Sequence, residues 1–442
     1  MLREYQQRAI ADLRACYQRG HRSPALILPT GAGKTVVAAE IIMLAVARGQ
    51  RVLFLVHRAE LLNQSVNKLE RAGVHDLRII QAGHDLGSPI APVTVASIPT
   101  LTRWTERQPK ADLVIVDECH HVMARTWRSL AEHYADAMLL GLTATPQRAD
   151  GRSIGDVFDS IVVGATVREL TDLGHLVPCR VFAPPATIEA KHIALDPVTA
   201  YQRHGEGQRA VIFCVTVEHA RETAEAMNQA GISCGVVDGK MAAGDRKSTL
   251  AALEQGSLRA VASIGVLTEG WDSPAVAVCI LARKPQHTGL YLQMAGRVLR
   301  PSPGKTHATL IDLCGSVHDH GPPDMDREYT LDGRGISKVD RDAIRQCLTC
   351  GAVFKAGPAT CPVCGVMTPR REIELPTALG MELVDLGSLP KLPPRSVTLS
   401  ITAKFPSKCR SCGQRIAVGQ QIYWNPAEKG AKHAVCGERV AA

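Results

Sequence analysis

The chain has 442 residues, 45% of them hydrophobic and 21% charged, a balance typical of globular proteins with two to four domains and a sizeable core. No apolar run reaches the roughly 18–20 residues that a membrane-spanning helix needs, and the first residues lack the apolar stretch of a secretory signal. We therefore expect a cytoplasmic protein with no membrane partner. The net charge of +8 permits attraction to polyanions but is too modest to identify one.

The first part of the chain alternates short apolar runs with helical patterns. Strands are expected at Ala25–Leu28, Val52–Val56, Val93–Ala96, Leu113–Val116 and Leu139–Leu142, and helices at Val36–Arg48 and Glu60–Ala72. Strands that alternate with helices predict an α/β domain with a parallel sheet covered on both faces. We place this domain at residues 1–165 and a proline-containing linker at 166–200.

A glycine-containing loop joins the first expected strand to the first expected helix, with the residues Thr30, Gly31, Ala32, Gly33, Lys34 and Thr35. Backbone N–H groups at a helix N-terminus bind anions, and glycine lets a phosphate approach the backbone. Lys34 adds a positive charge near the β- and γ-phosphates, and the Thr35 hydroxyl is a Mg²⁺ ligand. The full phosphate-loop pattern is not met, because Leu28 stands where its first glycine would be. The strand–loop–helix context still predicts an ATP site.

An acidic pair, Asp117 and Glu118, directly follows the apolar run Leu113–Val116. In a parallel sheet, a carboxylate at the end of a buried strand lies near the ligand crevice. We expect Asp117 to hold Mg²⁺, Glu118 to orient the attacking water, and His120 to be a connector. Alone, the pair could cap a helix. Beside a phosphate loop, it predicts phosphoryl transfer.

The alternation resumes after the linker and predicts a second α/β domain of similar design at residues 201–320. Strands are expected at Ala210–Val215, Ile232–Val237, Arg259–Ile264, Val276–Leu281 and Ala308–Leu313. Helices are expected at Glu218–Ala230, Asp245–Glu254 and Gly289–Leu299. A polar stretch rich in Gly, Asp and Pro, residues 315–338, is expected to be a loop or linker.

Two groups of cysteines lie near the end of the chain. Cys347, Cys350, Cys361 and Cys364 form two CxxC pairs ten residues apart, which predicts a Zn²⁺ ribbon at 340–370 rather than a pair of disulfides. Cys409, Cys412, His433 and Cys436 predict a second, Cys3His zinc finger at 396–442. Lys408, Arg410, Arg415 and Trp424 surround the second site, as is typical of a finger that contacts nucleic acid; a finger that docks protein is the alternative.

Several motifs, in chain order, resemble those of superfamily 2 helicases and translocases. They are the phosphate loop, the Asp117–His120 box, Leu142–Pro146, Val266–Pro274 and Gln293–Arg300. The resemblance covers residues 1 to about 315 and implies two tandem RecA-like domains. It also implies that Arg3 and Gln6, in the element Leu2–Gln6, read adenine, and that Gly270 and Asp272 contact the nucleotide.

The resemblance further implies the remaining site residues. Gln293, Arg297 and Arg300 would complete the catalytic site, with the two arginines on one face of the expected helix as arginine fingers. Contacts to nucleic acid are implied for His57, Arg58, Thr94, Ser97 and Thr268.

The motor followed by cysteine pairs resembles the RadD group of bacterial DNA-repair helicases near the XPB-like branch. This implies ATP, Mg²⁺ and two Zn²⁺ ions as cofactors, and single-stranded or forked DNA as the partner, together with repair or replication proteins. The tail is shorter than that group would have, so a phage helicase is an alternative. An RNA helicase, a duplex translocase that remodels nucleoprotein, and a catalytically silent zinc-finger protein are further alternatives.

Overall fold

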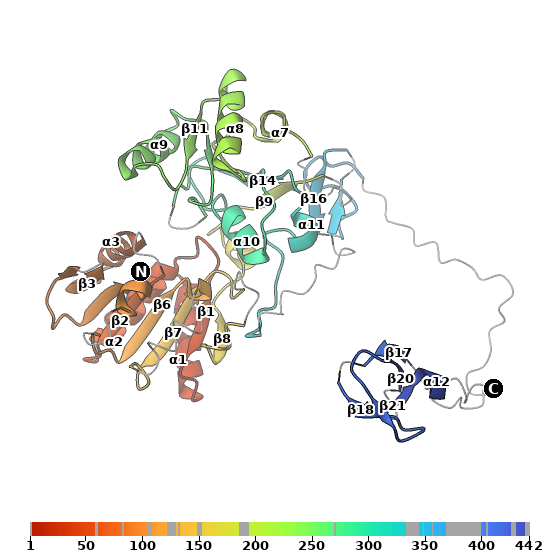
Figure 1. The fold of residues 1–442 in the computed structure, drawn as a ribbon. Helices are drawn as coiled ribbons and strands as arrows, with labels where there is room; N and C mark the ends of the chain where they lie inside the picture. Colours follow the sequence, from red (N-terminus) through yellow and green to blue (C-terminus); the bar gives the residue numbers. More distant parts are fainter. Residues whose placement is uncertain are drawn as a thin grey trace. The chain divides into compact units, whose positions relative to one another are not determined.

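The computed structural model describes residues 2–57, 61–81, 84–103, 108–121, 130, 133–147, 153–184, 194–268, 271–332, 344–347, 349–355, 357–367, 399–403, 405–425 and 430–437. The chain divides into two compact units, Met1–Arg370 and Arg371–Ala442. The first unit holds two sheets, each with its own helices (Figure 1). None of the helices in the described residues is long and apolar enough to cross a membrane.

The first lobe is an eight-stranded sheet in the order β4-β3-β5-β2-β6-β7-β1-β8. All neighbouring strands are parallel except β3 and β4. The strands are β1 (Pro24–Ile27), β2 (Val52–Val56), β3 (Leu77–Gln81), β4 (His84–Leu86), β5 (Val93–Ser97), β6 (Leu113–Asp117), β7 (Met138–Thr143) and β8 (Ser160–Val163). The helical segments are α1 (Glu4–Gln18), α2 (Lys34–Val46), α3 (Leu62–Arg71), α4 (Ile98–Leu101) and the 3₁₀ turn η2 (Cys119–His121).

Both faces of this sheet are buried, as the continuous apolar runs predict. Along β2, Phe54 belongs to the core that α1, α2 and α3 cover, whereas Leu53 and Leu55 belong to the core on the opposite face. The alternation follows from the two-residue period of a strand. The sheet is therefore held between two apolar layers, and the carboxyl ends of its central strands are left to carry polar loops.

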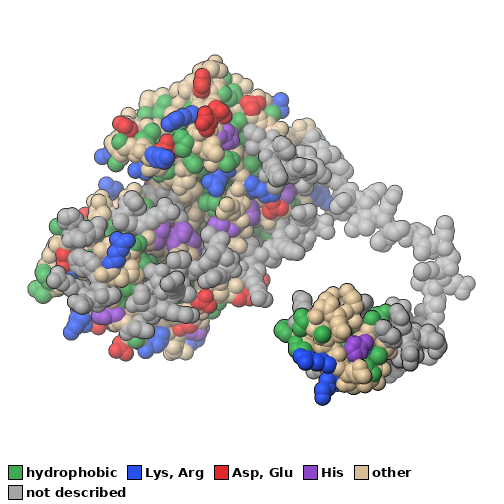
Figure 2. Space-filling view, in the orientation of Figure 1, with side chains coloured by type: hydrophobic (Ala, Val, Ile, Leu, Met, Phe, Trp, Pro, Cys, Tyr) green, Lys and Arg blue, Asp and Glu red, His purple; other side chains and the backbone are tan. Residues whose placement is uncertain are grey.

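The second lobe is another eight-stranded sheet, in the order β11-β12-β10-β13-β14-β9-β16-β15. Its strands are β9 (Cys179–Phe182), β10 (Ala210–Phe213), β11 (Cys234–Val237), β12 (Ala260–Ser263), β13 (Val278–Leu281), β14 (Ala308–Asp312), β15 (Ile344–Gln346) and β16 (Ala352–Lys355). Its helices are α7 (Pro197–His204), α8 (Val217–Gln229), α9 (Ala243–Gln255), α10 (Thr288–Gly296) and α11 (Val317–His320). Acidic and basic side chains are mixed on the face of this lobe seen in Figure 2.

The segment 166–200, expected to be a linker, contains regular structure that belongs to the lobes. It holds α6 (Val167–Asp172), β9 and the start of α7, and β9 pairs in parallel with β14. Pro178 and Pro184 lie on either side of β9, and Pro197 is the first residue of α7, a position that suits proline. The second lobe therefore begins well before residue 201.

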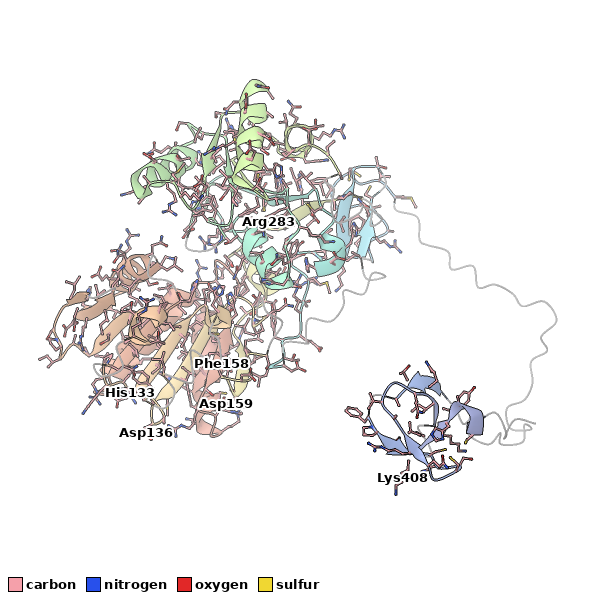
Figure 3. All side chains as sticks on the ribbon, viewed as in Figure 1. His133, Asp136, Phe158, Asp159, Arg283 and Lys408 are labelled. Carbon is pink, nitrogen blue, oxygen red and sulfur yellow. The ribbon has the colours of Figure 1, made fainter. Side chains whose placement is uncertain are left out.

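Strand β8 was not expected either, because its apolar run of four residues is too short to stand out. It pairs in parallel with β1 and closes that edge of the first sheet. Asp159, just before β8, accepts hydrogen bonds from the backbone amides of Arg22 and Ser23 at 2.7 and 3.1 Å (Figure 3). This carboxylate fixes the start of β8 beside the start of β1.

The predicted zinc ribbon is built into the second lobe. Its strands β15 and β16 pair with each other, and β16 pairs antiparallel with β9. Phe182 of β9 packs in one apolar cluster with Phe354 and the cysteines Cys347 and Cys361. The ribbon is therefore an extension of the motor sheet instead of a separate appendage.

The second unit is a small β module. A three-stranded sheet is made of β17 (Leu399–Thr402), β20 (Gln421–Asn425) and β21 (Gly430–His433), and a two-stranded one of β18 (Ser407–Lys408) and β19 (Arg415–Ile416). A short helix, α12 (Ala434–Gly437), follows. Its apolar core is small and includes Cys409 and Ile416, with Cys436 packed against it. A core of this size usually needs a metal or disulfide to be stable.

Candidate ATPase site and metal centres

A cavity of about 450 Å³ lies between the phosphate loop of the first lobe and the facing loops of the second. Its walls include most of the residues that the sequence assigns to nucleotide chemistry: Thr30, Gly31, Gly33, Lys34, Thr35, Asp117, Glu118, Asp272, Arg297 and Arg300. These residues come from two different sheets. The volume is in the range of small-ligand sites.

The phosphate loop has the backbone that anion binding requires. Gly31 and Gly33 have φ angles of 90° and 79°, in the left-handed region that glycine alone adopts without strain. Helix α2 begins at Lys34, and no side chain caps its first turn. The first amides of an uncapped helix lack partners and attract anions. Lys34, Thr35 and these amides therefore fit a triphosphate.

The second lobe touches this loop closely. A Cβ atom on Gly31 would lie 3.1 Å from Cγ of Arg300, and a Cβ on Gly296 would lie 2.8 Å from Cβ of Thr30. Glycine at both positions lets the backbones approach. The arginine that follows α10 is therefore brought beside the phosphate loop.

The acidic pair lies at the end of β6, beside Lys34. Burial raises the pKa of Asp117 to about 6, and the neighbouring Glu118 adds to the effect. Glu118 has a φ of 47°, rare for a residue with a side chain, and its Oε1 lies 3.5 Å from Nζ of Lys34. Strained backbone of this kind is concentrated at functional sites. Thr35 and Asp117 offer oxygen ligands that suit Mg²⁺, which would neutralise charge on the phosphates.

The two arginines of the second lobe differ in their surroundings. Helix α10 ends at Gly296, so Arg297 and Arg300 do not share a helix face as expected. Arg297 is 7% exposed and donates hydrogen bonds from Nη1 and Nη2 to the carbonyls of Trp271 and Thr268, both at 2.6 Å. Arg300 forms an ion pair with Asp272, whose side chain is 53% exposed. Arg300 is therefore the better placed to change partners when a nucleotide binds.

A hydrogen-bonded chain connects the lobes through His120. Nε2 of Gln293 lies 3.2 Å from Nε2 of His120, and Nδ1 of His120 lies 2.9 Å from Oγ1 of Thr143. The Thr143 hydroxyl in turn donates to the carbonyl of Thr145 at 2.6 Å. Gln293 and His120 are both buried. The structure thus places His120 as the connector that the sequence suggested, with Gln293 positioning it from the other lobe.

Arg3 and Gln6, expected to read adenine, lie behind the loop and are absent from the described walls of the cavity. The Gln6 amide donates to the carbonyl of Ala32 at 3.1 Å and accepts from the Arg3 backbone at 3.0 Å. The hydroxyl of Tyr5 donates to the same Ala32 carbonyl at 2.8 Å. Their observed contacts support the loop from outside, and adenine recognition by them stays a prediction.

The residues expected to contact nucleic acid are mostly not available on the surface. Thr94 and Ser97 are 6% and 0% exposed, and the Ser97 hydroxyl is bonded to that of Thr100 at 2.7 Å. Thr268 is also buried and donates to the carbonyl of Gly265. The hydroxyls of Ser97 and Thr268 are therefore occupied within the lobes. His57 is half-buried and stacks on His121. Arg58, together with Gly270 of the nucleotide set, lies outside the described residues.

One wall of the cavity was missed by sequence reasoning. Gln64, Ser65, Lys68 and Arg71 of α3 line it at helical spacing. Burial lowers the pKa of Lys68. The carboxylate of Asp117 opposes this effect, and the cations Arg300 and Arg297 add to it. Polar residues at this spacing resemble any solvated helix face, so only the three-dimensional contacts identify them. Lys68 adds a further cation to a cavity suited to a polyanion.

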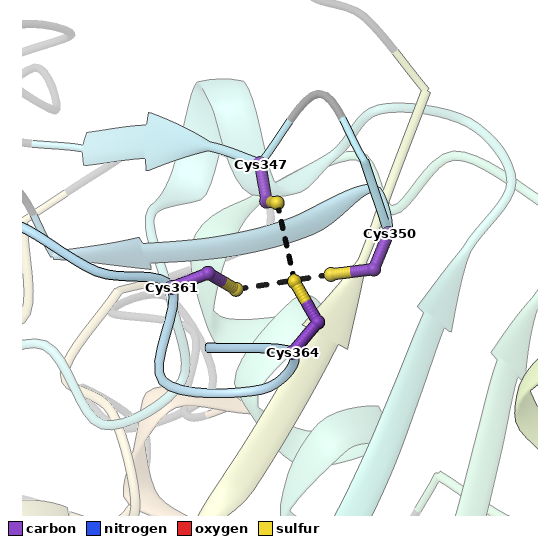
Figure 4. Close-up of side chains that lie close together, drawn as sticks. All are labelled: Cys347, Cys350, Cys361 and Cys364. Atoms are coloured by element: carbon purple, nitrogen blue, oxygen red, sulfur yellow. Dashed lines mark hydrogen bonds between the residues drawn. The ribbon is translucent and has the colours of Figure 1, made fainter. Parts of the chain in front are cut away.

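The first cysteine cluster brings four sulfur atoms together from the turns around β16 (Figure 4). Sγ of Cys347 lies 3.6 Å from that of Cys364, and Sγ of Cys350 lies 3.7 Å from that of Cys361. These distances are too long for a disulfide of about 2.05 Å. Four thiolates about 2.3 Å from one Zn²⁺ have neighbouring sulfurs about 3.7–3.8 Å apart. The donor set therefore fits zinc.

The second cluster brings together Cys409, Cys412, His433 and Cys436, with all ligand atoms within 4.8 Å of one another. Nδ1 of His433 lies 3.4 Å from Sγ of Cys412, and the His433 backbone amide lies 3.3 Å from Sγ of Cys409. Three thiolates and an imidazole form a common zinc donor set. Both predicted clusters are therefore assembled by the fold and could bind zinc.

Two RecA-like lobes that share one phosphate site define a motor-type ATPase. The family model for the type III restriction enzyme res subunit matches residues 1–148, and that for the helicase conserved C-terminal domain matches residues 191–302. A 51.5 kDa protein of a Lactococcus phage is 31% identical over 360 residues, which are 76% of each chain. The chain belongs to the superfamily 2 helicases and is an ATP-hydrolysing enzyme.

Two further comparisons give the extent of the likeness. The putative ATP-dependent helicase IRC3 of Saccharomyces cerevisiae is 26% identical over 72% of this chain, which spans 52% of that protein. A fragment of a putative HsdR subunit of a type I restriction enzyme from Vibrio vulnificus has a TM-score of 0.58 and 26% identity, over 75% of this chain and 67% of that one.

Replacement of Lys34 by Ala, or of Glu118 by Gln, should lower ATP turnover at least about 100-fold, because each removes a group that positions or stabilises the reacting phosphate. Phosphate release measures the effect. Lys247→Ala and Glu222→Gln, exposed on α9 and α8, are matched controls that should keep turnover. If Glu118→Gln is as active as the unaltered chain, Glu118 does not orient the water.

Replacement of the two arginines should separate stability from catalysis. Arg300→Ala should lower turnover about 1,000-fold or more with little change in Tm, because its partner Asp272 is solvated. Arg297→Ala should also lower Tm, by about 4 °C or more, because it leaves the buried carbonyls of Trp271 and Thr268 without donors. Steady-state turnover and thermal unfolding measure both. Equal Tm losses would contradict the distinction.

Loss of zinc should have different effects at the two clusters. Cys361→Ser with Cys364→Ser should release about one zinc ion per chain and weaken hydrogen-exchange protection in β9 and β14, because β16 pairs with β9. Cys412→Ser with Cys436→Ser should also release one zinc ion but leave β9 and β14 protected. Unchanged protection in the first variant would show that the ribbon does not support the motor sheet.

Proposed function

We propose that the chain is a DNA-stimulated ATPase that translocates on DNA and separates its strands. The observation that carries this is the cavity in which Lys34 and Glu118 of one lobe face Arg300 of the other. A site divided between two lobes couples hydrolysis to their relative movement. An ATPase that moves nothing would not need a charged residue from a second lobe in its site.

DNA is favoured over RNA by the comparisons. Two of them carry the names of restriction enzymes, and a relative that matches 76% of this chain is a phage protein. The net charge of +8 agrees with a polyanionic partner. We place the activity in the cytoplasm, in DNA repair, recombination or phage DNA metabolism, as the motifs shared with the RadD group suggest.

The residues perform this work in a definite order. Lys34 and the amides at the start of α2 bind the triphosphate, and Arg300 leaves Asp272 to approach the γ-phosphate. Glu118 accepts a proton from the attacking water while its strained backbone holds it in place. Gln293 and His120 connect the site to the Thr143–Thr145 segment by hydrogen bonds, so a change in the site alters that segment. Loss of the γ-phosphate releases Arg300, and the lobes move apart.

ATP turnover with and without DNA tests the proposal. We expect single-stranded or forked DNA to raise the rate about ten-fold or more, because closure of the lobes on the strand completes the site. Glu118→Gln with the same DNA is the control for contaminating ATPase. A rate that does not change with any DNA would overturn the proposal.

ATP turnover with RNA of the same sequence, and with a duplex that has no ends, distinguishes between the alternative functions. Stimulation by RNA alone would indicate an RNA helicase. Stimulation by closed duplex, with displacement of a triplex strand but not of a paired strand, would indicate a duplex translocase that remodels nucleoprotein.

A further inference from the structure

The terminal module, residues 396–442, is far more basic than the rest of the chain. It has seven Lys and Arg residues against two Glu, a net charge of +5 out of +8 for all 442 residues. The described part of the module contains no acidic residue. On the second lobe, by contrast, acidic and basic side chains are mixed (Figure 2). This asymmetry is an electrostatic footprint that fits a polyanion.

Three of the basic residues are held on one small hairpin. Lys408 of β18 is directly opposite Arg415 of β19, and both side chains are exposed. Arg410 is exposed in the turn between them. Like charges directly opposite one another destabilise a sheet pair. No acidic side chain within the described residues of the module is present to neutralise these three, and Lys408 extends from its edge (Figure 3).

The predicted metal site fixes the position of this hairpin. Arg410 lies between the ligands Cys409 and Cys412, and its backbone amide donates to the carbonyl of Ala431 at 3.0 Å. Nε2 of His433 lies 3.3 Å from the carbonyl oxygen of Arg415. The turn that carries the predicted metal ligands therefore also carries the charged side chains.

An exposed aromatic ring lies beside these charges. Phe405 is 79% exposed and is three residues before Lys408, and Val418, three residues after Arg415, is 61% exposed. The backbone amides of Ala403 and Gly419 bond across this region, which brings the two segments together. One exposed apolar residue is ordinary. An exposed ring flanked by unneutralised cations is the combination that binds unpaired bases and their phosphates.

We propose that Phe405, Lys408, Arg410 and Arg415 form a binding surface for single-stranded nucleic acid, separate from the motor. The three cations contact phosphates and Phe405 stacks on a base. This deepens the proposed function, on which it rests, by giving the motor a second contact with its strand. Stacking needs an unpaired base, so the surface selects single strands over duplex.

Fluorescence anisotropy with the full-length chain tests the surface. The probes are a labelled single strand of about 20 nucleotides, as DNA and as RNA, and a blunt duplex of the same sequence. Lys408→Glu, Arg410→Glu and Arg415→Glu together should raise Kd for a single strand about ten-fold or more. They should also lower the slope of log K against log salt by about two, because three phosphate contacts are lost.

A matched control carries the same change of charge elsewhere. Arg203→Glu, Arg221→Glu and Lys247→Glu, exposed on α7, α8 and α9, should leave Kd and the salt slope unchanged. An equal loss in this control would show that only net charge matters and would overturn the proposal. Two zinc ions per chain and an unchanged Tm confirm that the altered module is folded.

Phe405→Ala tests stacking without a change of charge. It should weaken single-strand binding about five-fold or more, the lower end of what one stacked base contributes, and leave duplex binding unchanged. Equal loss on duplex, or no loss on either single strand, would overturn the surface as a single-strand site. If the unaltered chain bound no strand at all, the proposed function itself would fail. Normal binding by the charge-reversed chain would refute only this inference.

Discussion

The close approach of two backbones at the phosphate loop is the constraint on which the motor depends. Gly296, at the end of α10, lies against Thr30, and Gly31 lies against Arg300. Side chains at either glycine would push the lobes apart by a few tenths of an ångström or more. Because the arginine comes from one sheet and the phosphate-binding amides from the other, the ATPase site exists only when the lobes are close. The fold thereby couples the chemistry of ATP to the movement of the two lobes.

The hydrogen-bonded chain through His120 connects this contact to the ends of two strands in the first lobe. Gln293 is on the second lobe, while in the first His120 follows β6 and Thr143 is the last residue of the adjacent strand β7. All three side chains are buried, where hydrogen bonds are strong and a missing partner is costly. A shift of α10 must therefore alter the groups at the ends of both strands. Glu118, which is proposed to orient the attacking water, is two residues from His120, so the same shift reaches it.

The sequence alone predicts the features that depend on neighbouring residues, namely the buried strands and the motifs beside them. The buried strands β1, β2, β5, β6 and β7 appear as apolar runs, the phosphate loop follows β1, and the acidic pair lies at the end of β6. Sequence reasoning missed β8, at the edge of the first sheet, and β9, inside the second, because an apolar run of four residues carries little periodic signal. It also placed Arg297 beside Arg300, whereas the end of α10 at Gly296 turns Arg297 toward the carbonyls of its own lobe. Contacts between residues far apart in the chain, such as those that bring α3 to the cavity, cannot be predicted from a single sequence.

The ribbon strands also determine how the second sheet ends. Without β16, strand β9 would present its unpaired backbone groups along one side, and exposed edges of this kind pair with other chains. The actual edge strand, β15, has three residues and is followed at once by the turn that carries Cys347. A short edge strand that runs directly into a tight turn is a poor template for another strand. The cysteine cluster thus lies where the sheet edge is short, a structural role distinct from any contact with a substrate.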